Sequence, residues 1–303
     1  MTTSTPASGG PHGRAVALGA GGAVGTAWMA GLVVGLHEAG VDLAEADLFI
    51  GTSAGAIVGA LLASGQDCSR LATPARAVGS QGTPPQVDGD RLGEVFAVLR
   101  DTGLTPAEKR PLVGRLAHTA ATGPEQAHIT RMGAMVGTDR WPDRKLLITA
   151  VDAGTGESEV FDGASGAPLS SVVAASTAFP GIYPPITIND RRYMDGGLRS
   201  GTSADLAVGA RVLVVIEPMA HLLPREPLTQ ELAQAGSDAV VTIGPDEETA
   251  QVFGRDLHDR AAWQPAYRAG VRQAGEAAER IRATWHNPRQ PPRLTIGSRE
   301  QAP

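Results

Sequence analysis

The stretch "RAVALGAGGAVGTAWMAGLVVGLHEAG", residues 14–40, joins a short apolar run to a glycine-rich turn and a longer apolar segment. Arg14–Leu18 predicts a buried strand, and residues 26–39 predict a helix that Gly40 ends. The turn between them, "GAGGAVG" at 19–25, has backbone N–H groups that no side chain obstructs. Such a turn binds either a phosphate or a developing oxyanion. The stretch therefore predicts the first strand–turn–helix unit of an α/β protein.

Two nucleotide-binding interpretations of this turn each fail on particular residues. A dinucleotide-binding G-x-G-x-x-G that starts at Gly19 requires glycine at position 24, where the sequence has Val24. A phosphate-binding P-loop requires a lysine at its end, but the lysines of the chain are Lys109 and Lys145. We therefore interpret the turn, together with the two motifs below, as an oxyanion hole.

The second motif is "GTSAG", residues 51–55, which follows an apolar strand candidate at 47–50 and precedes a helix candidate at 54–63. In a G-x-S-x-G motif the serine occupies a tight strand-to-helix turn, and the flanking glycines remove Cβ atoms that would clash there. The alternative is a serine that only caps the helix. The preceding strand and following helix favour Ser53 as a nucleophile, supported by Gly51 and Gly55.

A nucleophilic serine needs a base, which is commonly a histidine oriented by an acid. The histidines after Ser53 lie mostly in polar, helix-like surroundings, and none follows a strand at a glycine-marked loop: His118, His128, His221, His258 and His286. "MDGGL", residues 194–198, instead places Asp195 before Gly196 and Gly197, where another backbone can approach closely. The alternative for this motif is an Asp-Gly hairpin turn.

Composition limits the classes of function. Of the 303 residues 42% are hydrophobic and 19% charged, as in an ordinary globular protein. The net charge of −6 gives no basic face for nucleic acid, so we expect no nucleic-acid partner. The lone Cys68 excludes an intramolecular disulfide and a multi-cysteine metal site, and we predict it to be a buried structural thiol.

The remaining elements predict the fold class. Alternating strands and helices indicate a mainly parallel sheet covered by helices. Further strands are predicted at 145–151 and 211–216, and a helix at 264–285. The segment "ASTAFPGIYPPI" at 174–185 has three prolines, so we predict an ordered loop or a helix end there.

The chain is interpreted as one hydrolase domain over residues 14–286, with a disordered N-terminus at 1–13 and a flexible tail at 287–303. Helix-like segments broken by Gly/Pro turns make residues 65–140 a candidate cap or lid. Residues 15–36 carry no charge, but six glycines in them favour a buried strand–turn–helix over a membrane span. With no signal-peptide pattern, we expect a cytoplasmic protein that contacts membranes peripherally.

Together these motifs resemble the patatin-like phospholipase family. "AGGAVG", "GTSAG" and "DGG" occur in the family's order and spacing, and "ITAVDAGTGE" and "ASTAFPGIYPPI" resemble its connecting segments. The resemblance covers roughly residues 14–217 and weakens toward residue 285. It implies a patatin-like three-layer α/β fold, with a mainly parallel central sheet between helices.

The resemblance also implies a mechanism without histidine, metal or cofactor. Carried over, Ser53 is the nucleophile and Asp195 its base, and the backbone N–H groups of Gly21, Gly22 and Ala23 form the oxyanion hole. The implied activity is hydrolysis of carboxylic esters of lipids, of the phospholipase A or lysophospholipase type, through an acyl-enzyme. The alternatives are a non-phospholipid carboxylesterase with the same dyad, a Ser–His–Asp hydrolase that uses a late histidine, and a non-enzymatic scaffold.

The sequence departs from the family pattern at two positions. Ala20 stands where the family usually has glycine, which is harmless if its φ is negative, and Val24 stands where it has arginine or lysine. The missing cation weakens the expectation of a phosphate-bearing head group more than that of hydrolysis. Near Asp195, a substitute cation could come from Arg191, Arg192 or Arg199.

A lipid substrate also has to reach Ser53 from a bilayer or micelle. We expect an apolar rim from residues 65–140 for this contact. The candidates are Leu99, Leu104, Leu112, Val113 and Leu116. The alternative is that these side chains are ordinary helix-packing core.

Overall fold

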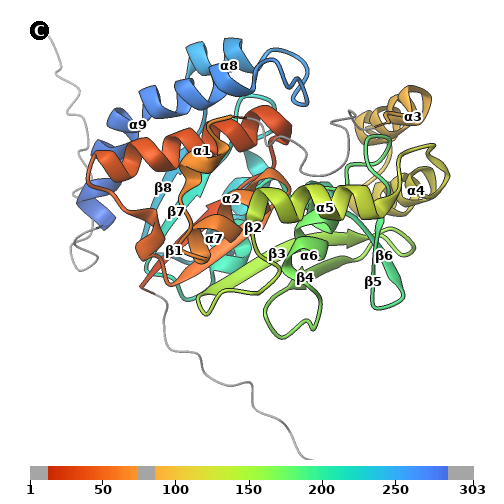
Figure 1. Cartoon of the computed structure of the whole chain (residues 1–303), viewed down its shortest axis with the longest axis horizontal. Helices are drawn as coiled ribbons and strands as arrows, with labels where there is room; N and C mark the ends of the chain where they lie inside the picture. The colour runs from red at the N-terminus through yellow and green to blue at the C-terminus, as the bar shows by residue number, and fades with distance from the viewer. Residues whose placement is uncertain (1–12, 74–85, 286–303) are drawn as a thin grey trace, which may run out of the picture.

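A computed structural model of the chain describes residues 13–73 and 86–285. The predicted disordered terminus, apart from Gly13, and the predicted tail lie outside these residues. Within the described part, an eight-stranded sheet lies between helices (Figure 1). This arrangement confirms the prediction of an α/β fold with a mainly parallel central sheet.

The strands pair in the series β5-β6-β3-β2-β1-β7-β8, in which β2 and β6 pair with successive parts of one side of β3 and β4 pairs with its other side. The strands are β1 Arg14–Leu18, β2 Leu48–Thr52, β3 Lys145–Asp152, β4 Ser158–Phe161, β5 Ile186–Ile188, β6 Arg191–Asp195, β7 Val212–Ile216 and β8 Ala239–Ile243. Five of them, β1, β2, β3, β7 and β8, form parallel pairs, whereas β4, β5 and β6 pair antiparallel.

The register brings the ends of three strands to one edge. Leu18 of β1 lies opposite Gly51 of β2 and Ile216 of β7. From β1 the sheet extends through β2 and β3 on one side and through β7 and β8 on the other. The carboxyl edge beside β1 is therefore a switch point of the topology, which is where open α/β sheets bind ligands.

Helices cover both faces of the sheet. They are α1 Gly22–Glu38, α2 Ala54–Ala63, α3 Gly89–Arg100, α4 Pro106–Thr119, α5 Glu125–Val136, α6 Leu169–Ser176, α7 Glu226–Ala235, α8 Glu247–Phe253 and α9 Trp263–Trp285. Val16 and Leu18 face one core with α1, α2, α5, α6 and α9, whereas Ala15 and Ala17 face a second core with α7 and the 3₁₀ turn Ala204–Ala207. β1 is thus covered on both faces, as expected for the centre of a parallel sheet.

Helices α1 and α9 lie side by side in direct backbone contact (Figure 1). A Cβ added at Gly31 would lie 2.0 Å from the Tyr267 carbonyl oxygen, and one at Gly270 would lie 2.1 Å from that of Trp28. Only glycine permits this approach. Helix α9 therefore fixes the position of α1, whose first turn belongs to the glycine-rich segment.

Several predicted boundaries need correction. Helix α1 begins at Gly22 rather than at residue 26, because the glycine-rich turn already forms its first turn. Strand β2 extends to Thr52, so it reaches the residue before Ser53. The prediction for "ASTAFPGIYPPI" is confirmed: α6 ends at Ser176, and a loop continues to β5. Strands β4, β5 and β8 and helices α7 and α8 were not predicted.

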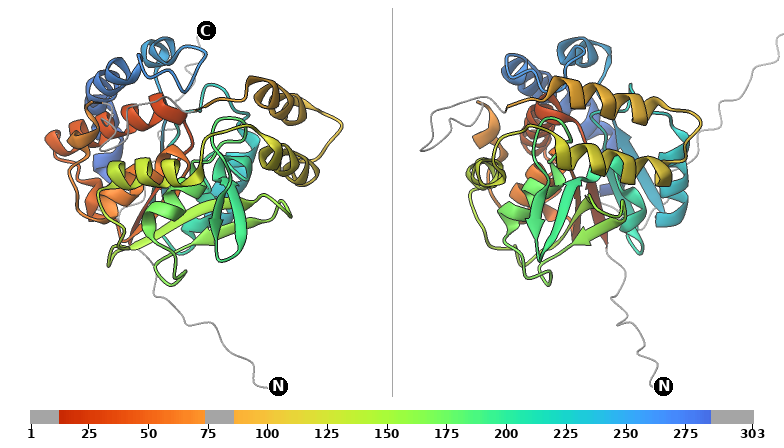
Figure 2. Two further views of the ribbon diagram at one scale, coloured as in Figure 1. Left: turned by 45° about the vertical axis from the view of Figure 1, so that its right-hand side comes forward. Right: turned by 90° about the vertical axis from the view of Figure 1, so that its right-hand side faces the viewer.

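Helices α3 and α4 form a pair at one side of the body (Figure 2). Val95 of α3 and Val113 of α4 are fully buried in a cluster that includes Val151 of β3 and Met194 of β6. The expected apolar rim is therefore wrong for Val113. Leu99 and Leu116 pack against the same cluster, and Leu104 and Leu112 are half-buried. Whether residues 65–140 move as a lid stays a prediction.

Two further observations bear on sequence-based predictions. Cys68 is buried, and this burial raises the pKa of its thiol to about 12, in line with a structural role. Across residues 13–73 and 86–285, none of the helices combines the length and apolar character needed to cross a bilayer.

Candidate active site

Ser53 occupies a sharp turn between β2 and α2. Its backbone adopts φ 53° and ψ −118°, an uncommon conformation for a residue with a side chain. A Cβ at Gly55 would lie 1.9 Å from the Leu18 carbonyl oxygen, and one at Gly51 would lie 2.6 Å from Ala56 Cα. Both glycines of the motif are thus required by close backbone packing, as the strand–turn–helix interpretation predicts.

Asp195 reaches Ser53 because two strands meet end to end. On β3, Thr149 pairs with Thr52 at the end of β2, and the next residue, Ala150, pairs with Asp195 at the end of β6. Strand β4 pairs with residues 148–151 from the opposite side of β3. Strands β2 and β6 therefore lie on the same side of β3, run toward each other, and place the two side chains at the junction.

The two side chains form a hydrogen bond. Ser53 Oγ donates to Asp195 Oδ2 over 2.8 Å, and Asp195 Oδ1 accepts the Gly197 N–H over 2.7 Å. Burial raises the pKa of Asp195 to about 7, although both hydrogen bonds act in the opposite direction. A carboxylate with a pKa near neutrality is matched to accepting and returning a proton near neutral pH.

The hairpin interpretation of the Asp-Gly motif is wrong. The hairpin of β5 and β6 turns at Asn189 and Asp190, both with positive φ, six residues upstream of Gly196. After Asp195 the chain instead enters the 3₁₀ turn Gly196–Leu198. A Cβ at Gly196 would lie 2.3 Å from the Thr149 carbonyl oxygen, so glycine lets this turn lie against β3.

The glycine-rich turn lies beside the Ser53–Asp195 pair. The Gly19 carbonyl accepts the Gly55 N–H over 3.1 Å, and a Cβ at Gly197 would lie 3.2 Å from Ala20 Cβ. Ala20 is not among the described residues with positive φ, so alanine is tolerated there. The turn is therefore bounded on one side by the strand-to-helix turn at Ser53, the serine elbow, and on the other side by residues 195–198, the aspartate loop.

Three backbone N–H groups at the start of α1 are available. None of the backbone hydrogen bonds in the described chain uses the N–H of Gly21, Gly22 or Ala23, which precede or open a helix whose geometry gives them no internal acceptor. The next N–H group, that of Val24, donates to the Leu257 carbonyl over 3.1 Å. The donors predicted from sequence thus coincide with the unpaired end of α1.

Sequence reasoning missed two groups around Ser53. Ser176 Oγ, at the end of α6, accepts the Ser53 N–H over 2.9 Å and so helps to hold the turn at Ser53. Ala54 opens α2, where helix geometry leaves its N–H without an internal partner. In a G-x-S-x-G motif the residue after the nucleophile commonly supplies an oxyanion donor, and this spacing was the available signal.

The histidines make other contacts. His128 Nε2 lies 2.9 Å from Thr177 Oγ1, and burial lowers the pKa of His128 to about 3. His118 Nδ1 contacts Arg192, and the His221 ring packs against Phe253. Among the described residues, no histidine shares a hydrogen bond with Ser53, so the geometry favours Asp195 as its partner; His286 lies outside these residues.

The arginines near Asp195 are engaged. Arg191 pairs with Asp152 over 2.7 Å, Arg199 pairs with Asp205, and Arg192 contacts His118 and the Pro185 carbonyl. Val24 is completely buried in the main core. Its side chain is therefore a packing element, and an arginine there would have to be buried.

The family model for patatin-like phospholipases matches residues 16–208. The chain belongs to this family. This patatin-like protein is accordingly a lipid acyl hydrolase by family, and the match includes Ser53 and Asp195 but ends before β7.

Two solved structures show distant similarity to this patatin-like chain. VipD from Legionella pneumophila is 14% identical with a TM-score of 0.43, and the match covers 89% of this chain and 67% of VipD. The type III effector protein ExoU is 19% identical with a TM-score of 0.35, covering 89% of this chain and 54% of ExoU. The chain thus spans about half the length of ExoU.

Across the part of the chain that the structure describes, no group of three or more His, Cys, Asp or Glu side chains is arranged to hold a metal ion.

Proposed function

We propose that the chain hydrolyses carboxylic esters of lipids through an acyl-enzyme on Ser53, with Asp195 as the base. The observation that carries this proposal is the 2.8 Å hydrogen bond from Ser53 Oγ to the buried Asp195 carboxylate. The family assignment supports lipid acyl hydrolysis as the reaction class.

The first half-reaction forms the acyl-enzyme. Asp195 accepts the hydroxyl proton of Ser53 while Oγ attacks the ester carbonyl carbon, and the C=O electrons move to oxygen. The N–H groups of Gly21, Gly22 and Ala23 stabilise this oxyanion, and the Ala54 N–H is a fourth candidate donor. The intermediate collapses, and the leaving alcohol takes the proton from Asp195.

The second half-reaction hydrolyses the acyl-enzyme and regenerates the free enzyme. Asp195 accepts a proton from water while the resulting hydroxide attacks the acyl carbon. When this second intermediate collapses, Ser53 Oγ leaves and regains the proton from Asp195, and the fatty acid is released. A carboxylate suffices as the base because burial raises the pKa of Asp195 to about 7.

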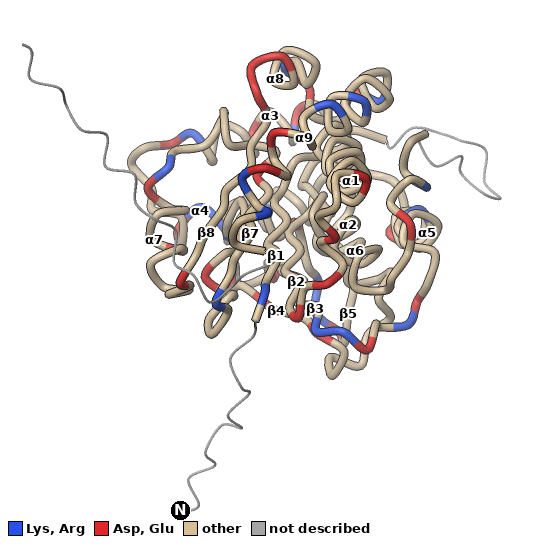
Figure 3. Tube along the Cα trace, turned by 90° about the vertical axis from the view of Figure 1, so that its left-hand side faces the viewer, with Lys and Arg blue, Asp and Glu red and all other residues tan. Residues whose placement is uncertain are grey.

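The substrate head group has two candidate classes. A phospholipid fits the family, whereas a neutral ester fits the local charges, because Val24 replaces the family cation and Arg199 is paired with Asp205. We propose that neutral esters compete with phospholipids at this site. Nothing in the charge distribution of the described residues favours a nucleic-acid partner, because basic and acidic positions alternate along the trace drawn in Figure 3.

We further propose that the protein, located in the cytoplasm, touches a membrane or micelle through exposed apolar side chains. Phe96 of α3 is 39% exposed, and its ring lies 5.8 Å from that of Phe179, in the loop after Ser176. Leu222 and Leu223 are 52% and 41% exposed. We propose these three residues for the contact in place of the buried Val113.

The experiment is hydrolysis of a lipid panel by the wild-type protein, with Ser53→Ala as the control. Release of fatty acid by the wild-type protein, abolished in Ser53→Ala, is the expected result. Comparing a diacyl phospholipid, a lysophospholipid and a neutral acylglycerol decides between the head-group classes. Equal release by both proteins would contradict the proposal.

A further inference from the structure

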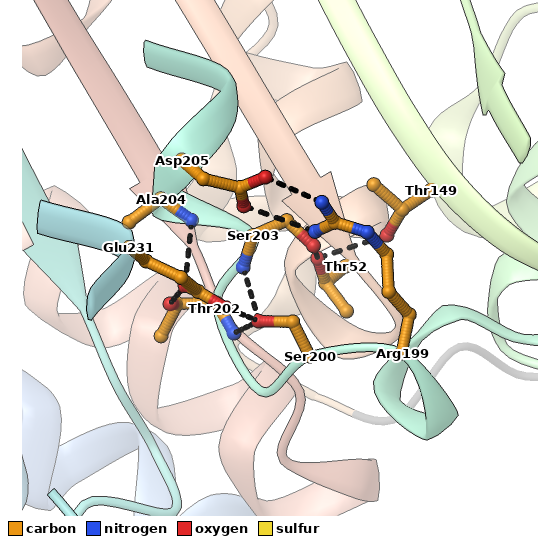
Figure 4. Close-up of polar contacts among 9 residues, drawn as sticks. All are labelled: Thr52, Thr149, Arg199, Ser200, Thr202, Ser203, Ala204, Asp205 and Glu231. Atoms are coloured by element: carbon orange, nitrogen blue, oxygen red, sulfur yellow. Dashed lines mark hydrogen bonds and ion pairs between the residues drawn. The ribbon is translucent and has the colours of Figure 1, made fainter. Parts of the chain in front are cut away.

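A polar network runs from Thr52, the residue before Ser53, to the carboxylate of Glu231 on α7 (Figure 4). Glu231 accepts hydrogen bonds from Thr202 Oγ1 over 2.7 Å, from the Ala204 N–H over 3.0 Å and from Ser200 Oγ. All three donors belong to the segment that follows the aspartate loop. The Glu231 side chain thus fixes the backbone conformation of residues 200–204.

This segment reaches the residue before the nucleophile. Ser200 Oγ accepts the N–H groups of Thr202 over 3.1 Å and Ser203 over 2.8 Å. Ser203 is fully buried with a positive φ, and Thr52 Oγ1 donates to its Oγ over 3.1 Å. Thr52 also contacts Thr149 Oγ1 over 3.0 Å, so the network joins the strand ends at which Ser53 and Asp195 meet.

The same segment reaches the residue before the oxyanion donors. The Gly201 carbonyl accepts the Ala20 N–H over 2.8 Å. A Cβ at Gly19 would lie 2.7 Å from the same carbonyl oxygen, which shows how closely the two backbones pack. A shift of residues 200–204 would therefore move the glycine-rich turn as well as the serine elbow.

We infer that Glu231 is a positioning residue of the active site. By fixing residues 200–204 it aligns Ser53, through Ser203 and Thr52, with the oxyanion donors, through Gly201 and Ala20. This inference rests on the proposed function of Ser53 and extends it to α7, a helix outside the 16–208 family match.

The chemistry of the network explains why a carboxylate stands at this position. Two hydroxyl groups and one N–H group all point their hydrogens at Glu231, and an ionised carboxylate only accepts. Glutamine has the same shape, but one of its oxygens is replaced by an NH₂ group that donates. In Glu231→Gln an NH₂ group therefore faces at least one hydroxyl or N–H donor in place of an accepting oxygen, and no cavity is created.

The test is titration of Ser53 with a fluorophosphonate, which reports both the fraction of competent sites and their rate of reaction. For Glu231→Gln we expect one label per chain, as in the wild-type protein, but phosphonylation at least about tenfold slower, since small misplacements cost this much. We expect kcat on a monomeric ester to fall in parallel while KM changes less than about twofold. Ser200→Ala, which breaks the network at its next residue, should slow both reactions in the same way.

The matched control is Glu226→Gln, the same chemical change on an exposed side chain of α7. It should leave the labelling rate and kcat unchanged. A wild-type rate per labelled site in Glu231→Gln and in Ser200→Ala would overturn the inference, because a merely structural residue would reduce the number of labelled chains and not their rate. If the wild-type protein is not labelled at all, the proposed function fails and the inference fails with it.

Discussion

Ser53 Oγ and Asp195 Oδ2 lie 2.8 Å apart although the residues are separated by 142 positions in the chain. The contact exists because β2 and β6 approach each other from opposite directions along the same side of β3. The dyad geometry is thus a property of the sheet, with one residue at the end of each strand. Its position does not depend on the conformation of a long loop.

The first prediction concerns pH. Because only the ionised carboxylate accepts a proton, and burial raises the pKa of Asp195 to about 7, kcat/KM should rise about tenfold per pH unit up to that value and then level off. The measurement is the pH dependence of kcat/KM on a soluble ester. A profile that is flat from pH 5 to pH 8 would contradict this assignment.

The second prediction links the same group to stability. The folded-state pKa of Asp195 lies above its unfolded value of about 3.9. As the pH falls, the folded state therefore binds this proton at a higher pH than the unfolded state does. The stability that this proton contributes is fully present below about pH 4 and is lost as the pH rises through about 7. Asp195→Asn keeps the shape without ionising, so its melting temperature relative to wild type should increase from pH 4 to pH 8. An unchanged difference would show that Asp195 carries no ionisation cost.

The sequence alone predicts the residues of the candidate site better than it predicts the strand and helix at the edge of the fold. Arg14–Leu18 and the Ser53 and Asp195 motifs were found from local patterns, because glycine spacing and apolar runs are encoded over a few residues, whereas the roles of Ser53 and Asp195 came from the family resemblance. Strand β8 and helix α7 were not predicted. β8 is an edge strand whose residues alternate only weakly between buried and exposed, and α7 is a short, mostly exposed helix. Neither element therefore has a strong apolar pattern in the sequence.

The missed groups share a physical reason. Ser176 and Glu231 act through hydrogen bonds to residues 123 and 27–31 positions away, which only the assembled sheet brings together. Likewise, Val24 replaces a cation in the family pattern, but only the structure shows that its side chain is fully buried in the core. Val113 was misread for the same reason, since an apolar helix face looks alike whether it packs inward or outward.

The third prediction tests the elbow packing. The methyl carbon added by Gly55→Ala would lie 1.9 Å from the Leu18 carbonyl oxygen, which is a steric clash. The free energy of unfolding should therefore fall by at least about 2 kcal/mol. Gly275→Ala is the matched control in α9, with no atom within 4 Å of the added carbon, and it should gain about 0.5–1 kcal/mol. Urea denaturation of both variants measures this. Equal effects would contradict the packing account.

The fourth prediction tests the apolar rim. Replacing Phe96 and Leu222 together by serine should weaken co-sedimentation with phospholipid vesicles several-fold, because each exposed side chain contributes up to about 1.5–3 kcal/mol when buried in lipid. The control is Val240→Ser, at the start of β8, because Val240 pairs with Leu213 at the opposite end of the sheet from Ser53. Hydrolysis of a monomeric ester should stay near the wild-type rate in both. Equal vesicle binding by all three proteins would show that the rim does not make the contact.

The central claim, that Ser53 and Asp195 act as one unit, is tested most directly by a double-mutant cycle on ester turnover. Ser53→Ala and Asp195→Asn should each remove nearly all kcat/KM, and the double variant should be little worse than either single variant, because paired catalytic groups are strongly non-additive. Peptide mapping of fluorophosphonate-treated wild-type protein should place the label on Ser53. Losses that multiply in the double variant, or a label on another residue, would contradict a shared dyad.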